Sequence, residues 1–359
     1  MSQYAREDIR RIEGYVPGEQ PQQRQYIKLN TNENPYPPAM SIGATLTCFN
    51  WDELRLYPEP TAKMVREKAA EIYHVEPYQV LCGNGSDDLL TIAVRTFVGA
   101  GQHVAYTEPS YSLYPVLAAL QGAIRKPVPL DEKYWLPPNA AELAERARLF
   151  LLARPNAPTG TSFPIELVEK LAREFKGVVW IDEAYADFAD DNCLELVNKY
   201  DNVIVSRTFS KSFSLAGIRL GLAFGNVELI KDMLKLKDSY NVNMLTQYLA
   251  VSALESINRM KENAKKICTV REHFSRELTT LGFSVLPSQA NFVFAQVPAD
   301  VTAKTIFQDL RDAGILVRFF NVPSLDNYLR ISIGTEAQMQ TVVEAIKAIL
   351  EKRRGQKQQ

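Results

Sequence analysis

Three short apolar runs in the middle of the chain each lead directly into polar residues. They are Leu149–Ala153, Gly177–Ile181 and Val203–Val205. A near-continuous apolar run of this length is typical of a strand that is buried on both faces, as in a parallel sheet. Ligand sites in such sheets lie at the carboxyl ends of the strands. The runs therefore predict an α/β fold with a site at that edge.

The predicted secondary structure follows two different patterns along the chain. Strand and helix patterns alternate over about residues 40–240, which predicts a doubly wound, mostly parallel sheet. From 245 to 281 the pattern is that of one long helix. Short strands follow at 283–286, 291–294, 315–318 and 328–333, with helices near 303–313 and at the C-terminal end. We predict a large α/β domain over residues 40–250 and a smaller α+β domain made of residues 1–39 and 251–359.

The segment after Val203–Val205 carries the strongest chemical signal. It is rich in Ser, Thr and Gly, and it holds Lys211 and, eight residues later, Arg219. Lysine can form a Schiff base with an aldehyde, and burial or nearby cations can bring its amine toward neutrality. Thr208, Ser210 and Arg219 are residue types that hold phosphate. A strand-end lysine is most often a solvated loop residue, but this convergence favours a cofactor site.

The segment from Thr208 to Arg219 resembles the lysine signature of the fold-type I pyridoxal-phosphate enzymes, and most closely that of the histidinol-phosphate aminotransferase branch. The resemblance covers nearly the whole chain, from Asn30 to Thr335, and its motifs occur in the order of the family. It implies that pyridoxal 5′-phosphate is the cofactor. It also implies that Lys211 binds the cofactor covalently, with Thr208, Ser210 and Arg219 among its further contacts.

A glycine-rich turn after the strand at 79–82 enters an apolar helix at 89–97. Free N–H groups and the positive end of the helix dipole suit a phosphate. The resemblance places Gly85, Ser86 and Asp87 at the cofactor phosphate. Because the carboxylate of Asp87 would repel a phosphate dianion, we expect backbone N–H groups to do the binding.

The resemblance also assigns residues to the cofactor ring. Tyr111 would lie against its flat face. Asp182 would face the pyridine nitrogen and keep it protonated, so that the ring can withdraw the electrons of a cleaved Cα–H bond. Asn156, in a loop stiffened by two prolines, and Tyr185 would both donate to the phenolic oxygen. In that loop Arg154 replaces the asparagine that is usual in the family.

Two arginines in the C-terminal part are predicted to bind the substrate. Most strand arginines are exposed edge charges. Arg330, however, alternates with Leu329 and Ile331 and lies on the opposite face of its strand. Its planar fork fits a carboxylate or a phosphate in two-point contact. In the family that the chain resembles, the positions of Arg318 and Arg330 bind the anionic end of the substrate.

Two N-terminal segments complete the predicted site. Leu29–Tyr36 resembles the family's entry motif, whose loop covers the active site, and we predict that Asn34 contacts the substrate. Tyr57 lies in a Tyr-Pro segment. In the family this tyrosine reaches the cofactor phosphate of the other subunit, which implies an obligate homodimer.

The activity implied by the resemblance is transamination of L-histidinol phosphate with 2-oxoglutarate, giving imidazole acetol phosphate and L-glutamate in histidine biosynthesis. Lys211 would act as the general base and acid. Alternatives are an aromatic amino-acid aminotransferase, a pyridoxal-phosphate decarboxylase of the threonine-phosphate type and a non-catalytic binding protein. The intact set of cofactor residues speaks against the last of these.

Composition limits the partners and the compartment. The 41 basic and 42 acidic residues leave a net charge of −1, so neither nucleic acid nor an anionic membrane surface is a predicted partner. Four cysteines and three histidines are scattered, which predicts free thiols in a reducing compartment and no metal site. The charged N-terminus lacks a signal-peptide pattern, and no run is long enough to span a bilayer. We expect a soluble cytoplasmic protein.

Overall fold

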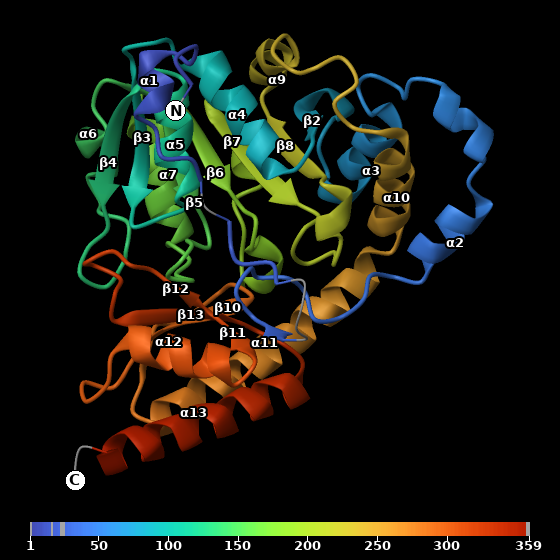
Figure 1. The fold of residues 1–359 in the computed structure, drawn as a ribbon. Coiled ribbons are helices and arrows are strands. Elements are labelled where there is room, and N and C mark those ends of the chain that lie inside the picture. Colours follow the sequence, from blue (N-terminus) through green and yellow to red (C-terminus); the bar gives the residue numbers. More distant parts are fainter. Residues whose placement is uncertain (1, 16, 22–25, 357–359) are drawn as a thin grey trace.

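The computed structural model describes residues 2–15, 17–21 and 26–356. Its largest element is a seven-stranded sheet, which lies in the upper part of Figure 1. The strands run in the order β2 (Val80–Gly83), β8 (Gly221–Gly225), β7 (Val203–Thr208), β6 (Val178–Asp182), β5 (Ala147–Ala153), β3 (His103–Glu108) and β4 (Ile124–Pro129). Only β8 runs antiparallel to its neighbours in this sheet of the described chain. The predicted mostly parallel α/β fold is confirmed.

The apolar runs form strands because both of their faces are covered. Successive side chains of a strand point to opposite faces. In β5, Leu149 and Leu151 belong to one buried cluster, whereas Phe150 and Leu152 belong to the other. The first cluster is shared with α4 (Ser86–Phe97), α5 (Leu113–Leu120) and α9 (Val227–Leu234), and the second with α3 (Lys63–Tyr73), α7 (Ile165–Glu174) and α8 (Leu196–Lys199).

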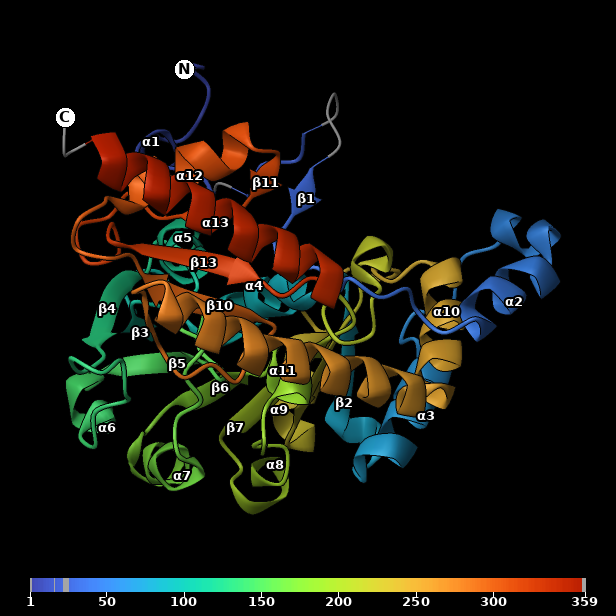
Figure 2. The same cartoon turned by 90° about the horizontal axis from the view of Figure 1, so that it is seen from below.

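A second, smaller sheet lies below the first in Figure 1. It is antiparallel and has the order β12 (Arg318–Phe319), β13 (Tyr328–Ser332), β10 (Phe292–Gln296) and β9 (Ser284–Val285). Figure 2 shows α11 (Ile257–Thr280) and α13 (Glu336–Gln356) side by side along it, with α12 (Ala303–Asp312) packed on α13. The N-terminal strand β1 (Ile27–Lys28) joins this part of the molecule by pairing with β11 (Ile315–Leu316).

The predicted single strand at 315–318 is two strands in two sheets. Leu316 pairs with Lys28 of β1, whereas Arg318 pairs with Arg330 of β13. One straight strand cannot keep both partners, so the chain changes sheets at Val317. The change of sheets brings Arg318 beside Arg330.

The predicted single helix over 245–281 is also divided. It forms α10 (Met244–Glu255) and α11, which are separated at Ser256. No proline or glycine marks this break. The Ser256 hydroxyl instead meets that of Ser41 at 2.8 Å. The predicted stop at Gly282 is confirmed, with a left-handed φ of 93° that favours glycine.

The remaining elements are short and lie mostly at the periphery. They are α1 (Glu7–Arg10), α2 (Ser41–Cys48), α6 (Ala140–Leu143) and the 3₁₀ turns η1 (Trp51–Arg55), η2 (Pro77–Gln79), η3 (Ala186–Phe188) and η4 (Ala216–Ile218). In the described part of the chain, no helix combines the length and the apolar character needed to cross a membrane.

Candidate active site

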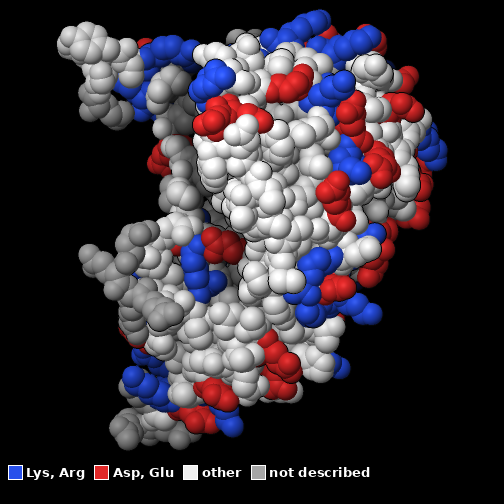
Figure 3. All heavy atoms as spheres, turned by 90° about the vertical axis from the view of Figure 1, so that its right-hand side faces the viewer, with Lys and Arg blue, Asp and Glu red and all other residues white. Residues whose placement is uncertain are grey.

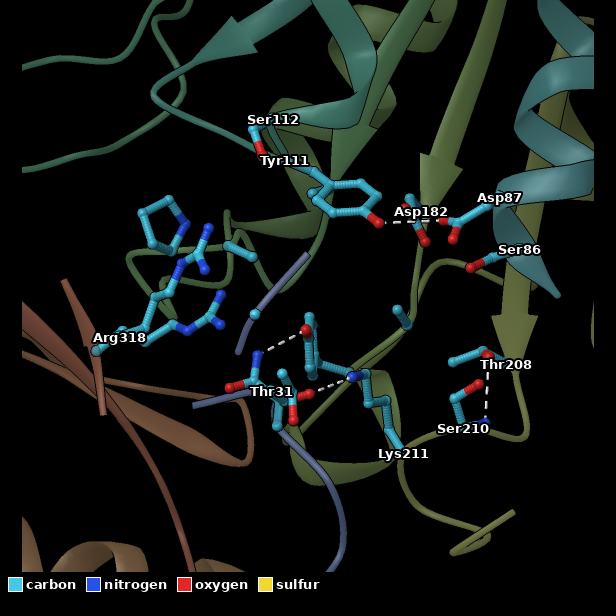
Figure 4. A pocket seen from close by; sticks show the side chains of 18 of the residues that line it. Thr31, Ser86, Asp87, Tyr111, Ser112, Asp182, Thr208, Ser210, Lys211 and Arg318 are labelled. Carbon is cyan, nitrogen blue, oxygen red and sulfur yellow. Dashed lines mark hydrogen bonds between the residues drawn. The ribbon is translucent and has the colours of Figure 1, made fainter. Parts of the chain in front are cut away.

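A cavity of about 230 Å³ lies between the carboxyl ends of β5, β6 and β7 and the smaller sheet. Figure 4 shows its lining side chains arriving from both sheets and from the N-terminal segment. The cavity brings together most of the residues predicted from the sequence, which are Ser86, Asp87, Tyr111, Asp182, Tyr185, Thr208, Ser210, Lys211, Arg219, Arg318 and Arg330. The cavity thus lies at the carboxyl ends of the parallel strands, where the site was predicted.

Lys211 follows β7 and points into this cavity (Figure 4). Its Nζ donates to the backbone carbonyl of Thr31 at 3.0 Å and lies 5.7 Å from the ring centroid of Tyr185. Burial, followed by the positive charge of Arg330, lowers the pKa of the Lys211 amine from 10.5 to about 8. The amine therefore loses its proton far more readily than that of an exposed lysine, which suits a nucleophile or base.

Asp182 ends β6 and is buried, with 5% of its surface exposed. Its carboxylate accepts hydrogen bonds from the Tyr114 hydroxyl at 3.1 Å and the Ser206 hydroxyl at 3.2 Å. Ser206 in turn accepts from the Trp180 indole N–H, which directs the serine proton to Asp182. Burial raises the pKa of Asp182 to about 6. This is a buried acid whose ionised form calls for a cationic partner.

Tyr111 lines the cavity, and Figure 4 shows its hydroxyl directed at Asp87. Its hydroxyl donates to Asp87 at 3.1 Å, and its ring makes edge contacts with Tyr15 and Tyr114. The Asp87 carboxylate is also 3.8 Å from the Arg219 guanidinium. Because Asp87 is engaged by a tyrosine and an arginine, its charge is partly offset at the place where an anion was predicted.

The turn before α4 is packed tightly against neighbouring backbone. Gly85 has a φ of 90°, and a Cβ there would lie 2.6 Å from Arg219 Nη2. A Cβ on Gly221 would lie 2.7 Å from the backbone nitrogen of Ser86. Both glycines are therefore needed for the close approach of β8 and Arg219 to the helix N-terminus.

Donors converge beside this turn. Arg219 Nη1 donates to the Ser210 hydroxyl at 3.1 Å, and the Ser210 N–H donates to the Thr208 hydroxyl at 3.2 Å. Ser86 is the first residue of α4, so its N–H belongs to the unpaired donors of a helix N-terminus. Helix dipole, guanidinium and hydroxyls together form a cradle for a phosphate-like anion.

The two predicted substrate arginines lie on the opposite wall. Arg330 Nη2 donates to the carbonyl of Asn30 at 3.0 Å, and its Nε has no hydrogen-bond partner in the described part of the chain. Phe292 and Phe320 flank the guanidinium, with ring centroids 5.3 and 5.6 Å away. Burial, reinforced by the charge of Arg318, lowers the pKa of Arg330. Such a pair of cations provides a receptor for an anionic group.

Gly85, Asn156, Asn34 and Tyr57 fall outside the described lining of the cavity. The side chain of Asn156 is fully buried and uses its hydrogen-bonding groups on nearby atoms. Its Nδ2 donates to the carbonyl of Pro109 and the hydroxyl of Thr159, while its Oδ1 accepts from Ser110. In this structure Asn156 therefore braces the loop after β5.

Asn34 was predicted to contact the substrate, but its amide is directed elsewhere. Nδ2 donates to the backbone carbonyls of Lys211 and Ser212, each at 3.1 Å, and Oδ1 accepts the N–H of Tyr36. The short side chain thus links the entry segment to the lysine loop. Tyr57 is 78% exposed and stacks on Tyr240 at 4.5 Å, outside the cavity.

Arg154 has structural contacts that the sequence left open. It is buried, and it donates to the carbonyl of Phe163 at 2.7 Å and to Asp191 at 2.6 Å. Its Nη1 lies 4.0 Å from Glu183, whose other oxygen is 2.9 Å from Arg207. The replacement is therefore accommodated by an ion pair with the partly exposed Asp191 and by the buried carboxylate of Glu183.

Comparison with known proteins shows the family to which the chain belongs. The model of the aminotransferase class I and II family matches residues 24–346. Histidinol-phosphate aminotransferases of Geotalea uraniireducens and Microcystis aeruginosa are 44% and 42% identical over 96% of this chain and 99% and 98% of theirs. The crystal structure of the Sinorhizobium meliloti enzyme of that name, in complex with pyridoxal-5′-phosphate, shares the fold, with a TM-score of 0.89, 24% identity, and 98% and 99% of the two chains covered. The chain belongs to the aminotransferase class I and II family, in the branch of the histidinol-phosphate aminotransferases.

Proposed function

We propose that this enzyme transfers the amino group of L-histidinol phosphate to 2-oxoglutarate, giving imidazole acetol phosphate and L-glutamate in histidine biosynthesis. Full-length relatives that carry the name of this activity support the proposal. The observation that carries it is the meeting, in one cavity, of a lysine with a lowered pKa, a buried carboxylate and paired arginines. These are Lys211, Asp182, Arg318 and Arg330.

The residues of the cavity fit pyridoxal 5′-phosphate. The cradle formed by Ser86, Ser210 and Arg219, which Gly85 allows to come close together, would take the phosphate, and buried Asp182 would take a protonated ring nitrogen. Lys211 would bind the aldehyde carbon. We assign Tyr111 and Tyr185 to the ring and its phenolic oxygen, and Asp87 and Thr208 to supporting contacts. Asn156, whose amide donates to Pro109 and Thr159, would reach the phenolic oxygen only by giving up one of these bonds. When bound, the cofactor supplies a ring that withdraws the electron pair of the Cα–H bond.

The chain's own residues bind the substrate and move its proton. Arg318 and Arg330 would hold the phosphate of one substrate and a carboxylate of the other, because both groups match a forked guanidinium. Lys211 Nζ, whose pKa is lowered by burial and by Arg330, would take the proton from the substrate Cα and deliver it to C4′ of the cofactor. Asn34 would act on the substrate indirectly, by holding the lysine loop through its hydrogen bond to the Lys211 carbonyl.

An aromatic amino-acid aminotransferase is the second candidate, because the rings of Tyr15, Tyr111 and Phe320 also line the cavity. Product analysis separates the two. We expect equal amounts of imidazole acetol phosphate and glutamate from histidinol phosphate and 2-oxoglutarate. Higher activity on phenylalanine or tyrosine would select the second candidate. Carbon dioxide released from threonine phosphate without a keto product would select a decarboxylase.

We further propose a homodimer in which Tyr57 reaches the cofactor phosphate of the partner subunit. Large apolar side chains are exposed along one stretch of the chain, namely Met40, Trp51, Leu54, Leu56 and Tyr57. This stretch lies on the side of the molecule that faces the viewer in Figure 3, where a broad central area carries few charged side chains. Exposed apolar surface of this kind is typical of an interface. Sedimentation at micromolar concentration would test it.

We also propose a cytoplasmic location and a division into two domains. All four cysteines are free thiols, which supports a reducing compartment such as the cytoplasm. We propose that residues 40–250 form the cofactor-binding domain, and that residues 1–39 with 251–359 form the small domain. Limited proteolysis with and without substrate would show whether cleavage concentrates at these boundaries.

A further inference from the structure

Asn32 connects the smaller sheet to the cofactor side of the cavity. It is 2% exposed and has a left-handed φ of 58°, a conformation that asparagine tolerates better than most residues. Its backbone N–H donates to the Ser332 hydroxyl at 2.9 Å, and its carbonyl accepts from Asn291 at 3.0 Å. Its side chain makes two further hydrogen bonds. Oδ1 accepts from the Ser332 hydroxyl at 2.8 Å, and Nδ2 donates to the Tyr185 hydroxyl oxygen at 2.8 Å.

The direction of these hydrogen bonds is set by the first donor. A backbone N–H can only donate, so the Ser332 oxygen accepts it and the serine proton goes to Oδ1 of Asn32. The amide Nδ2 is thereby turned to Tyr185, whose oxygen accepts. A phenol has one proton. Because the Tyr185 oxygen accepts from Asn32, its proton is available for an acceptor other than Asn32. Tyr185 lines the cavity.

We propose that Asn32 and Ser332 are positioning residues, which aim the O–H of Tyr185 at the phenolic oxygen of the bound cofactor. Ser332 lies two residues after Arg330 on β13, so both side chains are on the same face of the strand. Strand β13 therefore carries both Arg330, the proposed anchor of the substrate anion, and Ser332, which accepts the hydrogen bond of the Asn32 N–H. Tyr185 and Asn32 are 153 residues apart in sequence, and the link crosses between the two sheets.

A positioning role of Asn32 should affect the pKa of the bound cofactor, which a merely structural role would not. A hydrogen bond donated to an ionised oxygen stabilises the ionised form and lowers its pKa. In Asn32→Asp the donor becomes a carboxylate, which is a stronger acceptor, so Tyr185 turns its proton away from the cofactor. The pKa of the bound cofactor should then rise. The inference depends on the proposed function only in assigning Tyr185 to the cofactor, and its test needs no amino donor.

The experiment is a pH titration of the visible absorbance of the cofactor-loaded enzyme without substrate. We expect Tyr185→Phe and Asn32→Asp each to raise the midpoint by about 1 pH unit, and Ser332→Ala to raise it less. Asn32→Asp should shift the midpoint less when it is added to Tyr185→Phe than when it is made alone, because the proton it redirects is already missing and only the charge of the new carboxylate remains. Asn291→Ala, which removes only the bond to the Asn32 carbonyl, is the matched control and should leave the midpoint in place.

An unchanged midpoint in folded Asn32→Asp and Ser332→Ala would overturn the proposal. So would a shift from Asn32→Asp that persists in full when residue 185 is already phenylalanine, since that effect would not pass through the hydroxyl. If the titrations follow the expectation but histidinol phosphate is not a substrate, the positioning role stands and the proposed substrate falls.

Discussion

Arg318 of β12 is the direct register partner of Arg330 of β13, and both side chains line the cavity that contains Lys211. Two guanidinium groups on one wall repel each other, and the charge of Arg318 adds to burial in lowering the pKa of Arg330. An anion placed between them removes this repulsion. The cavity is thus suited to substrates that carry a phosphate or a carboxylate at one end.

Removing one of these cations should weaken the binding of both substrates. We expect Arg330→Ala to raise KM for histidinol phosphate and for 2-oxoglutarate by roughly 10- to 100-fold, because a hydrogen bond to a charged group contributes about 1.5–3 kcal/mol. The cofactor should still bind. Steady-state kinetics for each substrate would measure this, with Arg354→Ala, whose partner is Asp300, as the control. An unchanged KM for both substrates would count against the assignment.

The lowered pKa of Lys211 has a kinetic consequence. Only the neutral amine attacks an aldehyde, so attachment of cofactor to the apoenzyme should accelerate with pH and level off above about pH 8, where Lys211 loses its proton. Below that pH, the neutral fraction falls about tenfold per unit. Arg330→Ala should move the midpoint upward, because it removes a neighbouring positive charge. Stopped-flow absorbance would record both, and a rate that still climbs at pH 10 would contradict this reading.

Above about pH 6, the buried charge of Asp182 should destabilise the folded apoenzyme relative to a variant with a neutral residue at this position. Its folded-state pKa of about 6 exceeds the usual 3.8, so the folded state holds this proton more tightly than the unfolded state. Stability is therefore lost as pH rises from about 4 to 6, by up to about 3 kcal/mol. We expect apo Asp182→Asn to melt above apo wild type at pH 8, with a smaller difference at pH 5. Cofactor affinity should fall. An equal loss of melting temperature at both pH values would disprove the effect.

The cross-subunit role of Tyr57 can be tested with hybrid dimers. A Lys211→Ala subunit retains Tyr57, and a Tyr57→Ala subunit retains Lys211, so one site of each hybrid would be complete. Random reassociation of an equal mixture should restore about one quarter of wild-type activity at limiting cofactor, because half of the dimers are hybrids with one such site. Activity that stays at the sum of the separate variants would show that Tyr57 acts within its own chain.

The sequence predicted the part of the site that is encoded locally. The central buried strands are recognisable as apolar runs. Asp182 follows its run directly, and Lys211 lies in the polar segment just after β7. Their meeting follows from the parallel sheet, whose carboxyl ends lie at one edge. Gly85 was recognisable because a glycine turn before a helix is a local pattern.

What the sequence could not predict depends on partners far away in the chain. Nothing local distinguishes Asn32 from any polar loop residue, and its bond to Tyr185 exists only after both sheets have packed. The same holds for Tyr114 and Ser206 on Asp182. The helix break at Ser256 and the change of sheets at Val317 likewise follow tertiary contacts and not residue preference.

The most direct test of the central claim is a half-reaction. Cofactor-loaded enzyme is mixed with L-histidinol phosphate in the absence of any acceptor, and the absorbance of the bound cofactor is followed with time. We predict rapid loss of the yellow aldehyde form, with one imidazole acetol phosphate released per site, and much slower loss with phenylalanine or tyrosine. A loaded enzyme whose spectrum is unchanged by histidinol phosphate, or one that reacts only with an aromatic amino acid, would contradict the proposed function.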